Sequence, residues 1–126
     1  MTSNQEVGRN GEELVAGLLT DQGYSVLARN WRGTGGEIDI VALDGHTLVG
    51  VEVKTRTSLR FGHPAEAITA RKVARMRRVL GEWLAHNRAG CGGLFRDIRL
   101  DVVAVTMPCS TDEPAPAQVD VLKGVS

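Results

Sequence analysis

Three acidic residues and one lysine have the types and spacing of a metal-assisted hydrolytic site. Glu37 and Asp39 lie in one short run, and Glu52 and Lys54 lie in a second run about a dozen residues later. Carboxylate oxygens are hard ligands that suit Mg²⁺ or Mn²⁺. A lysine beside such an ion can hold a phosphate or orient the attacking water. The pattern therefore indicates metal-dependent hydrolysis of a phosphodiester, with magnesium or manganese as the cofactor.

A β-hairpin is predicted to carry these side chains. Residues 37–43 (EIDIVAL) and 47–55 (TLVGVEVKT) alternate in polarity, and Asp44-Gly45 between them is a strong turn signal. Because successive side chains point to opposite faces, a loop of even length puts the acids and the lysine on one face. The other face, which is the expected core side, then holds the apolar residues Ile38, Ile40, Val51 and Val53.

The length of the hairpin loop decides which acids face each other. A two-residue loop, Asp44-Gly45, pairs Glu37 with Glu52, whereas a four-residue loop, 44–47, pairs Asp39 with Glu52. A loop of three residues would break the shared face, and the sequence does not choose among these lengths. On chemistry alone, a solvated strand face with cross-strand Glu–Lys pairs is an equal alternative to a metal site.

A helix is predicted before the hairpin, over residues 8–20, with Gly23 ending it as the residue after the C-cap. At 100° per residue, Gly11 lies under the middle of its apolar stripe and Glu12 at the edge, while Glu13 lies on the opposite side. The two adjacent glutamates are therefore not equivalent. The stripe itself consists of Leu14, Val15, Leu18 and Leu19.

The rest of the chain completes a predicted α/β pattern. A long amphipathic helix is expected from His63 to about Arg88, with Pro64 in its first turn. In a later strand, Arg99 and Asp101 share a face and are expected to form an internal ion pair that supports the sheet. The further strands are predicted at residues 24–28, 98–106 and, at a sheet edge, 119–122.

Length and composition indicate a single globular domain. The 126 residues fit one core, and 42% are hydrophobic and 24% charged. Fifteen basic residues balance fifteen acidic ones, so the molecule as a whole does not attract nucleic acid. Residues 1–6 are expected to be frayed, and residues 108–118 to form a polar, proline-containing loop.

The sequence also predicts a location in the cytoplasm and no membrane partner. It contains no apolar run of the roughly eighteen residues that a membrane span needs, and its start lacks a signal-peptide pattern. Cys91 and Cys109 form no CxxC motif, so two reduced thiols are expected. Aromatic residues, at 4%, are too few for a stacking platform that binds single strands.

The second predicted helix concentrates positive charge. It holds Arg71, Lys72, Arg75, Arg77 and Arg78, and no acid between positions 67 and 81. Arg71, Arg75 and Arg78 cluster opposite the apolar face, and Lys72 lies toward its edge. This stripe is expected to contact a nucleic-acid backbone, which sets affinity and register without reading sequence. The alternative is a solvated helix face.

Several motifs together carry a resemblance to a known family. The spacing of Asp39, Glu52 and Lys54 resembles the D-x(n)-E-x-K signature of the restriction-endonuclease-like (PD-(D/E)XK) nuclease superfamily. With four further motifs, the chain resembles the bacterial YraN-like family of predicted endonucleases over residues 8–106. Those motifs are Gly11-Glu12, Arg29-Asn30-Trp31-Arg32, Phe61-Gly62 and Arg99-x-Asp101-Val102-Val103.

The resemblance implies a restriction-endonuclease-like fold, in which helices flank a central mixed β-sheet, as in Holliday-junction resolvases. It implies that Glu12, Asp39 and Glu52 bind the metal and that Lys54 is the catalytic lysine. The substrate would be DNA, with branched or damaged DNA as candidates, and a homodimer follows by analogy with the resolvases. The expected nucleic-acid contacts are Arg56 at the end of the strand and Arg71, Lys72, Arg75 and Arg78 of the helix.

Two other classes of function compete with an endonuclease. The first is a nucleic-acid-binding module that does not catalyse by itself and acts with a partner. The second is a scaffold whose basic helix meets an acidic protein. The presence of Glu12, Asp39, Glu52 and Lys54 together favours the enzyme, and the salt dependence of DNA binding distinguishes the binding module from the scaffold.

Overall fold

The computed structural model describes residues 4–56, 68–91, 95–107 and 118–125. In this part of the chain, no helix is both long and apolar enough to cross a membrane. The helices and strands are α1 (Asn4–Asp21), β1 (Ser25–Arg32), β2 (Glu37–Asp44), β3 (Thr47–Arg56), α2 (Ala70–Cys91), β4 (Asp97–Thr106) and β5 (Gln118–Leu122).

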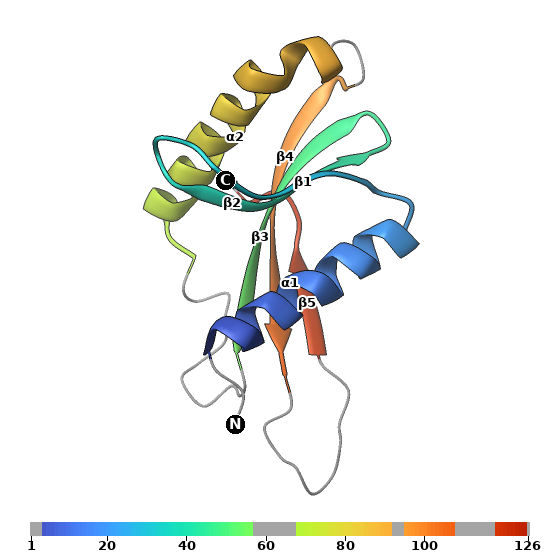
Figure 1. The fold of residues 1–126 in the computed structure, drawn as a ribbon, viewed down its shortest axis with the longest axis vertical. Helices are drawn as coiled ribbons and strands as arrows, with labels where there is room; N and C mark the ends of the chain where they lie inside the picture. The colour runs from blue at the N-terminus through green and yellow to red at the C-terminus, as the bar shows by residue number, and fades with distance from the viewer. Residues whose placement is uncertain (1–3, 57–67, 92–94, 108–117, 126) are drawn as a thin grey trace, which may run out of the picture.

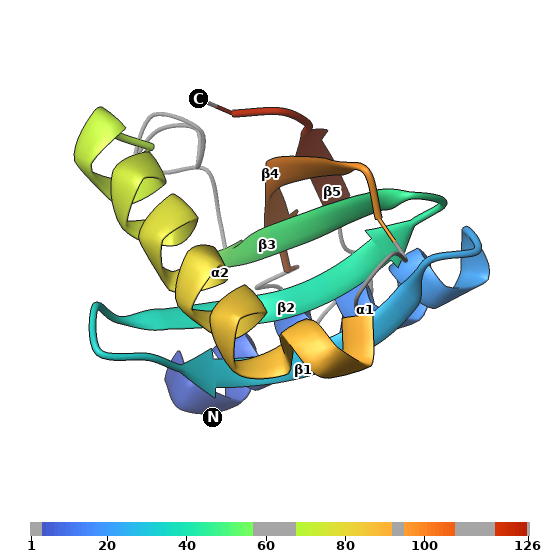
Figure 2. The same ribbon diagram turned by 90° about the horizontal axis from the view of Figure 1, so that it is seen from above.

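The strands form one mixed sheet in the order β1-β2-β3-β4-β5. The pair β3–β4 is parallel, and α2 lies in the crossover between its two strands, as a parallel connection requires. The other neighbouring pairs are antiparallel. Figures 1 and 2 show α1 on one face of the sheet and α2 on the other. The predicted α/β fold, a mixed sheet flanked by helices, is confirmed.

Both faces of the sheet are buried, so the molecule has two apolar clusters. The cluster under α2 contains Val41, Leu48 and Leu100 of the sheet with Met76 and Leu80 of the helix. The cluster under α1 is built from β2, β3 and β4 together with Val15, Ala16 and Leu19. The central strands are therefore covered on both sides, which explains why their apolar runs are nearly continuous.

The hairpin turn has the register of the longer predicted loop. Leu43 lies opposite Leu48, and Asp44 lies opposite Thr47. This last pair tightens the connection to the two residues Gly45 and His46, and Gly45 adopts the positive φ (62°) that such a turn requires. The alternative that paired Glu37 with Glu52 is wrong, because it needs a register shifted by two residues.

The sheet opens at its middle into a fork. Pairing between β2 and β3 ends at Ile40 and Val51. Before Ile40, β2 remains paired with β1, and after Val51, β3 remains paired with β4 as far as Arg56 and Thr106. In Figure 1 the start of β2 turns toward α2, while the end of β3 runs away from it. The two strands that carry the predicted acids therefore diverge where those acids lie.

One of the four residues predicted for the shared core face is misplaced. Ile40, Val51 and Val53 belong to the cluster under α1, but Ile38 belongs to the cluster under α2. The strict alternation fails at this point because Asn30, on the neighbouring strand β1, has a positive φ of 51°. Such a residue reverses the alternation of side chains locally, and β2 follows this change at the fork.

The helix boundaries also differ from the predicted ones. The second helix begins at Ala70 and not at His63, because Ile68 and Thr69 precede the helix and the Thr69 hydroxyl caps it, accepting the Lys72 N–H at 3.1 Å. Residues 63–67, Pro64 included, lie outside the described residues.

Parts of the two segments that were expected to lack helix or strand, residues 1–6 and 108–118, belong to a helix and a strand. α1 begins at Asn4, within the segment expected to be frayed, and its last residue is Asp21, two residues before the left-handed Gly23 (φ 93°) that was predicted to end it. Gln118, the last residue of the expected polar loop, already belongs to β5. The rest of that loop, residues 108–117, is not described.

Candidate active site

Asp39 lies at the fork and is the centre of the candidate site. One of its carboxylate oxygens, Oδ2, accepts the Val53 N–H of the diverging strand at 2.8 Å. Burial, together with the negative charges of Glu12, Glu52 and Glu37, raises the pKa of Asp39 from 3.8 to about 7. The hydrogen bond from Val53 lowers the pKa of Asp39, but by less than burial and the neighbouring charges raise it. Asp39 is thus a carboxyl group in a place that disfavours its charge.

The three surrounding carboxylates come from different elements of the fold. Glu37 begins β2, Glu52 lies on β3 just past the fork, and Glu12 lies on α1. Helix α1 can reach the fork because Gly11 packs directly on Thr55 of β3, where any Cβ would overlap the threonine side chain. The absence of a side chain at position 11 is therefore what brings Glu12 to the site.

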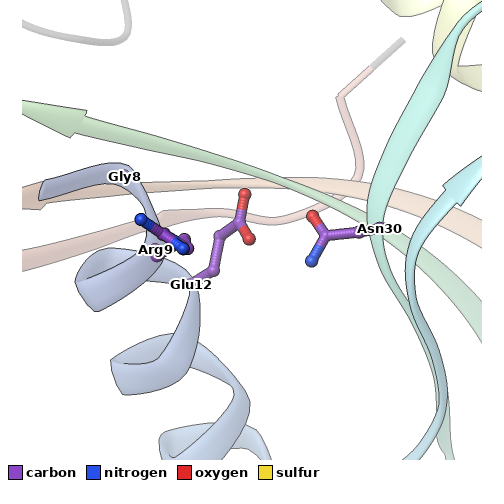
Figure 3. Close-up of a pocket in the computed structure, with 4 residues that line it drawn as sticks. All are labelled: Gly8, Arg9, Glu12 and Asn30. Carbon is purple, nitrogen blue, oxygen red and sulfur yellow. The ribbon is translucent and has the colours of Figure 1, made fainter. Parts of the chain in front are cut away.

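Glu12 and Glu13 have the different environments that the helical periodicity predicts. Glu13 is 70% exposed and forms an ion pair with Arg29 at 2.7 Å. Glu12 is half-buried and lines an open pocket of about 430 Å³ with Gly8, Arg9 and Asn30. Figure 3 shows its carboxylate directed from α1 toward Asn30. The prediction that Glu12 contributes to the site is thus consistent with its position.

Arg75 reaches the candidate site from α2. Its guanidinium lies 3.5 Å from the Glu52 carboxylate. The Nε of this guanidinium is buried and has no hydrogen-bond partner in the described part of the chain. Arg75 was predicted on an exposed stripe, but it turns instead against Gly36 and the fork, since the left-handed Gly36 (φ 140°) has no Cβ to exclude it.

A glutamate that the sequence reasoning did not single out positions the turn between β1 and β2. Glu82 of α2 accepts the Thr34 N–H at 2.8 Å, the Thr34 hydroxyl at 2.8 Å and the Gly35 N–H at 3.2 Å. The bonds from Thr34 lower the pKa of Glu82. The signal was the three glycines at positions 33, 35 and 36, which leave room for helix side chains against the turn. This anchor fixes the start of β2, and therefore Glu37, beside α2.

The remaining basic residues of the prediction flank this centre. Lys54 follows Glu52 by two residues and so lies on the same face of β3. Arg56 is the last residue of that strand. On α2, Arg71 and Arg78 are exposed and lie about one turn to either side of Arg75, while Lys72 is half-buried. The structure thus places basic groups on both elements that border Glu52.

The carboxylates fit a hard divalent cation in kind and in charge. The raised pKa of Asp39 indicates a group of acids whose mutual repulsion a bound cation would reduce. Among the described residues, however, no three Asp, Glu, His or Cys side chains form a ready-made metal site. Mg²⁺ does not require one, because it commonly uses one or two carboxylates together with water and substrate phosphates. Asp39 and Glu52 are the residues that suit this role best, with Glu12 on the other side.

Comparison with known proteins gives one consistent relationship. The pattern of the Uncharacterised protein family UPF0102 matches residues 11–105. A UPF0102 protein of Beutenbergia cavernae is 46% identical over 125 residues, covering 99% of both chains. One from Kineococcus radiotolerans is 51% identical over 120 residues, covering 95% of this chain and 93% of the relative. The match therefore includes the whole candidate site.

Proposed function

The chain belongs to the UPF0102 family, and we propose that it is a metal-dependent endonuclease that hydrolyses phosphodiester bonds of DNA. One observation carries the proposal. Asp39 is half-buried at a fork in the sheet, the charges of Glu12, Glu37 and Glu52 act on it, and its pKa is raised to about 7. A purely structural sheet gains nothing from such a cluster, whereas a site that receives Mg²⁺ needs it.

The proposed chemistry divides the work among the residues at the fork. Asp39 and Glu52 would hold the ion, assisted by Glu12, and the bound ion would polarise the scissile phosphate and lower the pKa of an attacking water. Lys54, on the same face as Glu52, would donate hydrogen bonds to the phosphate or orient the water. Its positive charge would stabilise the negative charge that grows on the phosphate oxygens in the transition state.

Arg75 supports a phosphate as the substrate group. Its buried Nε–H has no acceptor within the described residues, although a buried donor of this kind is costly when it is left unpaired. A phosphate next to Glu52 would supply that acceptor, since guanidinium and phosphate match in geometry and charge. The ion pair with Glu52 offsets part of the negative charge at the fork.

The basic side of α2 supports a polyanionic substrate rather than a small phosphate ester. Arg71 and Arg78 continue from Arg75 along an exposed helix face. The molecule has no net charge, so this local stripe would be what attracts a nucleic-acid backbone. The resemblance to PD-(D/E)XK nucleases and junction resolvases favours DNA, including branched DNA. By the same analogy two copies would act on the two strands of a junction.

The deciding experiment is cleavage of a panel of labelled DNAs with Mg²⁺ or Mn²⁺. The panel contains duplex, single-stranded, flap and four-way-junction substrates, and the variants are Asp39→Ala, Lys54→Ala and, as a matched control, Lys123→Ala. Lys123 is exposed beyond the last strand. We expect metal-dependent cuts that fall by at least about a hundredfold in the first two variants and persist in the control.

A different outcome would support the binding module instead. If no substrate is cut by any protein, yet DNA binding persists and weakens steeply with salt, the protein contacts DNA without catalysis. Cuts of equal rate in Asp39→Ala and wild type would indicate a contaminating nuclease and contradict the assigned site.

A further inference from the structure

We propose that the pocket between α1 and β1 binds one unpaired nucleotide next to the scissile phosphate, with Asn30 contacting the base edge and Arg9 the nucleotide's own phosphate. This inference rests on the proposed nuclease function and extends it to the shape of the substrate. It assigns the pocket to recognition rather than to the reaction itself.

The position of the pocket makes it continuous with the candidate active site. Its lining consists of Gly8, Arg9, Glu12 and Asn30. Glu12 is shared with the acidic cluster, because its charge acts on Asp39. Any group bound in the pocket is therefore a neighbour of the atoms that react. The volume, about 430 Å³, lies at the small end of ligand pockets and suits one nucleotide.

Asn30 has an unusual backbone that directs its side chain into this space. Among the described residues, it is the only one other than glycine with a positive φ, and it lies inside β1, where extended residues are expected. Figure 3 shows its amide facing the Glu12 carboxylate across the pocket. In the described part of the chain, this amide has no hydrogen-bond partner. Asparagine, after glycine, is among the residues that adopt this backbone conformation most readily, and the exposed side chain of Asn30 is accessible to a ligand.

The chemistry of the lining selects a nucleotide with a free base edge. An asparagine amide presents a donor and an acceptor side by side, which is the arrangement that matches the edge of a base. In a paired duplex, the Watson–Crick edge is already occupied, and a base enters a pocket only when it is unpaired or turned out of the stack. Arg9 is exposed and suits a phosphate of the same nucleotide. The expected substrates are therefore DNAs with an unpaired nucleotide beside the cleaved bond.

The test compares binding to two DNAs of the same sequence, a fully paired duplex and a duplex with one unpaired nucleotide. Fluorescence anisotropy is measured with Ca²⁺ in place of Mg²⁺, so that binding is separated from cleavage. The variant is Asn30→Gly, which allows the same backbone conformation and removes the amide. Asn10→Ala, at an exposed asparagine of α1 outside the pocket lining, is the control.

We expect the wild type to bind the DNA with the unpaired nucleotide about tenfold more tightly than the duplex. Asn30→Gly should lose this preference and still bind the paired duplex as the wild type does, and Asn10→Ala should keep it. A preference that survives in Asn30→Gly would overturn the proposal, because the amide would then play no part.

The experiment also separates failure of this inference from failure of the proposed function. A wild type with no preference, whose cleavage of duplex still depends on Asp39, refutes the pocket proposal and leaves the nuclease intact. A wild type that neither binds nor cuts either DNA refutes both.

Discussion

Asp39 and Asp101 lie in the same sheet, but the protein treats their charges in opposite ways. Asp101 is 2% exposed and accepts hydrogen bonds from Arg99 at 2.9 and 3.0 Å and from the Gly124 N–H at 3.0 Å. In the described part of the chain, Asp39 accepts one hydrogen bond, from Val53, and is surrounded by other carboxylates. The charge of one aspartate is neutralised within the fold, and the charge of the other is not.

The difference separates an acid whose charge is paired within the fold from an acid that lies among like charges. Around Asp101, Arg99 also contacts Asp44 at 3.1 Å and the Tyr24 hydroxyl at 2.9 Å, so one guanidinium ties β4 to the hairpin turn and to the start of β1. The hydrogen bonds with Asp101 raise the pKa of Arg99 and keep it charged. This closed network stabilises the fold, whereas the acids at the fork repel one another and disfavour the charged form of Asp39.

The largest expected effect is the loss of the Asp101 charge. Asp101→Asn leaves the half-buried Arg99 without its main partner, so we expect a loss of about 3 kcal/mol in the free energy of unfolding, measured by urea denaturation. Asp97→Asn, an exposed aspartate of the same strand, is the matched control and should change the value by less than about 0.5 kcal/mol. If the two substitutions changed the free energy of unfolding equally, the charge of Asp101 would not be specially stabilised by its partners, and the contrast between Asp101 and Asp39 would be wrong.

Removing the charge of Asp39 is expected to raise the free energy of unfolding, whereas removing the charge of Asp101 lowers it. A carboxyl group with a pKa of about 7 in the folded protein and near 4 in the unfolded one favours folding when protonated, and this contribution is lost as pH rises through 7. In EDTA at pH 8, Asp39→Asn should therefore stabilise the protein by about 2 to 4 kcal/mol. At pH 5 the gain should be clearly smaller, as followed by urea denaturation at each pH.

Added Mg²⁺ provides the control for this prediction. An ion that binds the folded protein raises the melting temperature of the wild type, because binding shifts the folding equilibrium. Asp39→Asn should lose most of this rise, since one of its ligands is gone. If Asp39→Asn raised the free energy of unfolding by the same amount at pH 5 and pH 8, Asp39 would not be the group with the raised pKa.

The smallest effect is expected for an acid that is paired but exposed. Glu13 forms its ion pair with Arg29 at 2.7 Å, yet its side chain is 70% exposed. Solvent screens such pairs, so Glu13→Gln should change the free energy of unfolding by less than about 0.5 kcal/mol. A loss close to that of Asp101→Asn would mean that pairing, and not burial, decides what a charge contributes here.

Much of the fold was accessible from local patterns. Periodicity predicted both helices and the central hairpin, because alternation and helical spacing reflect which side chains must be buried. It also distinguished Glu12 from Glu13, and the predicted ion pair of Arg99 with Asp101 is confirmed. The start of α2 was missed by seven residues, since the capping role of Thr69 was not considered and the apolar pattern does not mark a cap.

The sequence by itself thus determined the order of the helices and strands and the polar character of the strands that carry Asp39 and Glu52. Only the tertiary structure decided that β2 and β3 part at Ile40 and Val51, that Ile38 changes face and that Arg75 turns to Glu52. These features depend on contacts between residues far apart in the chain and on the left-handed backbone at Asn30. A local hydrophobic pattern cannot encode them, because it records whether a side chain is buried and not which partner buries it.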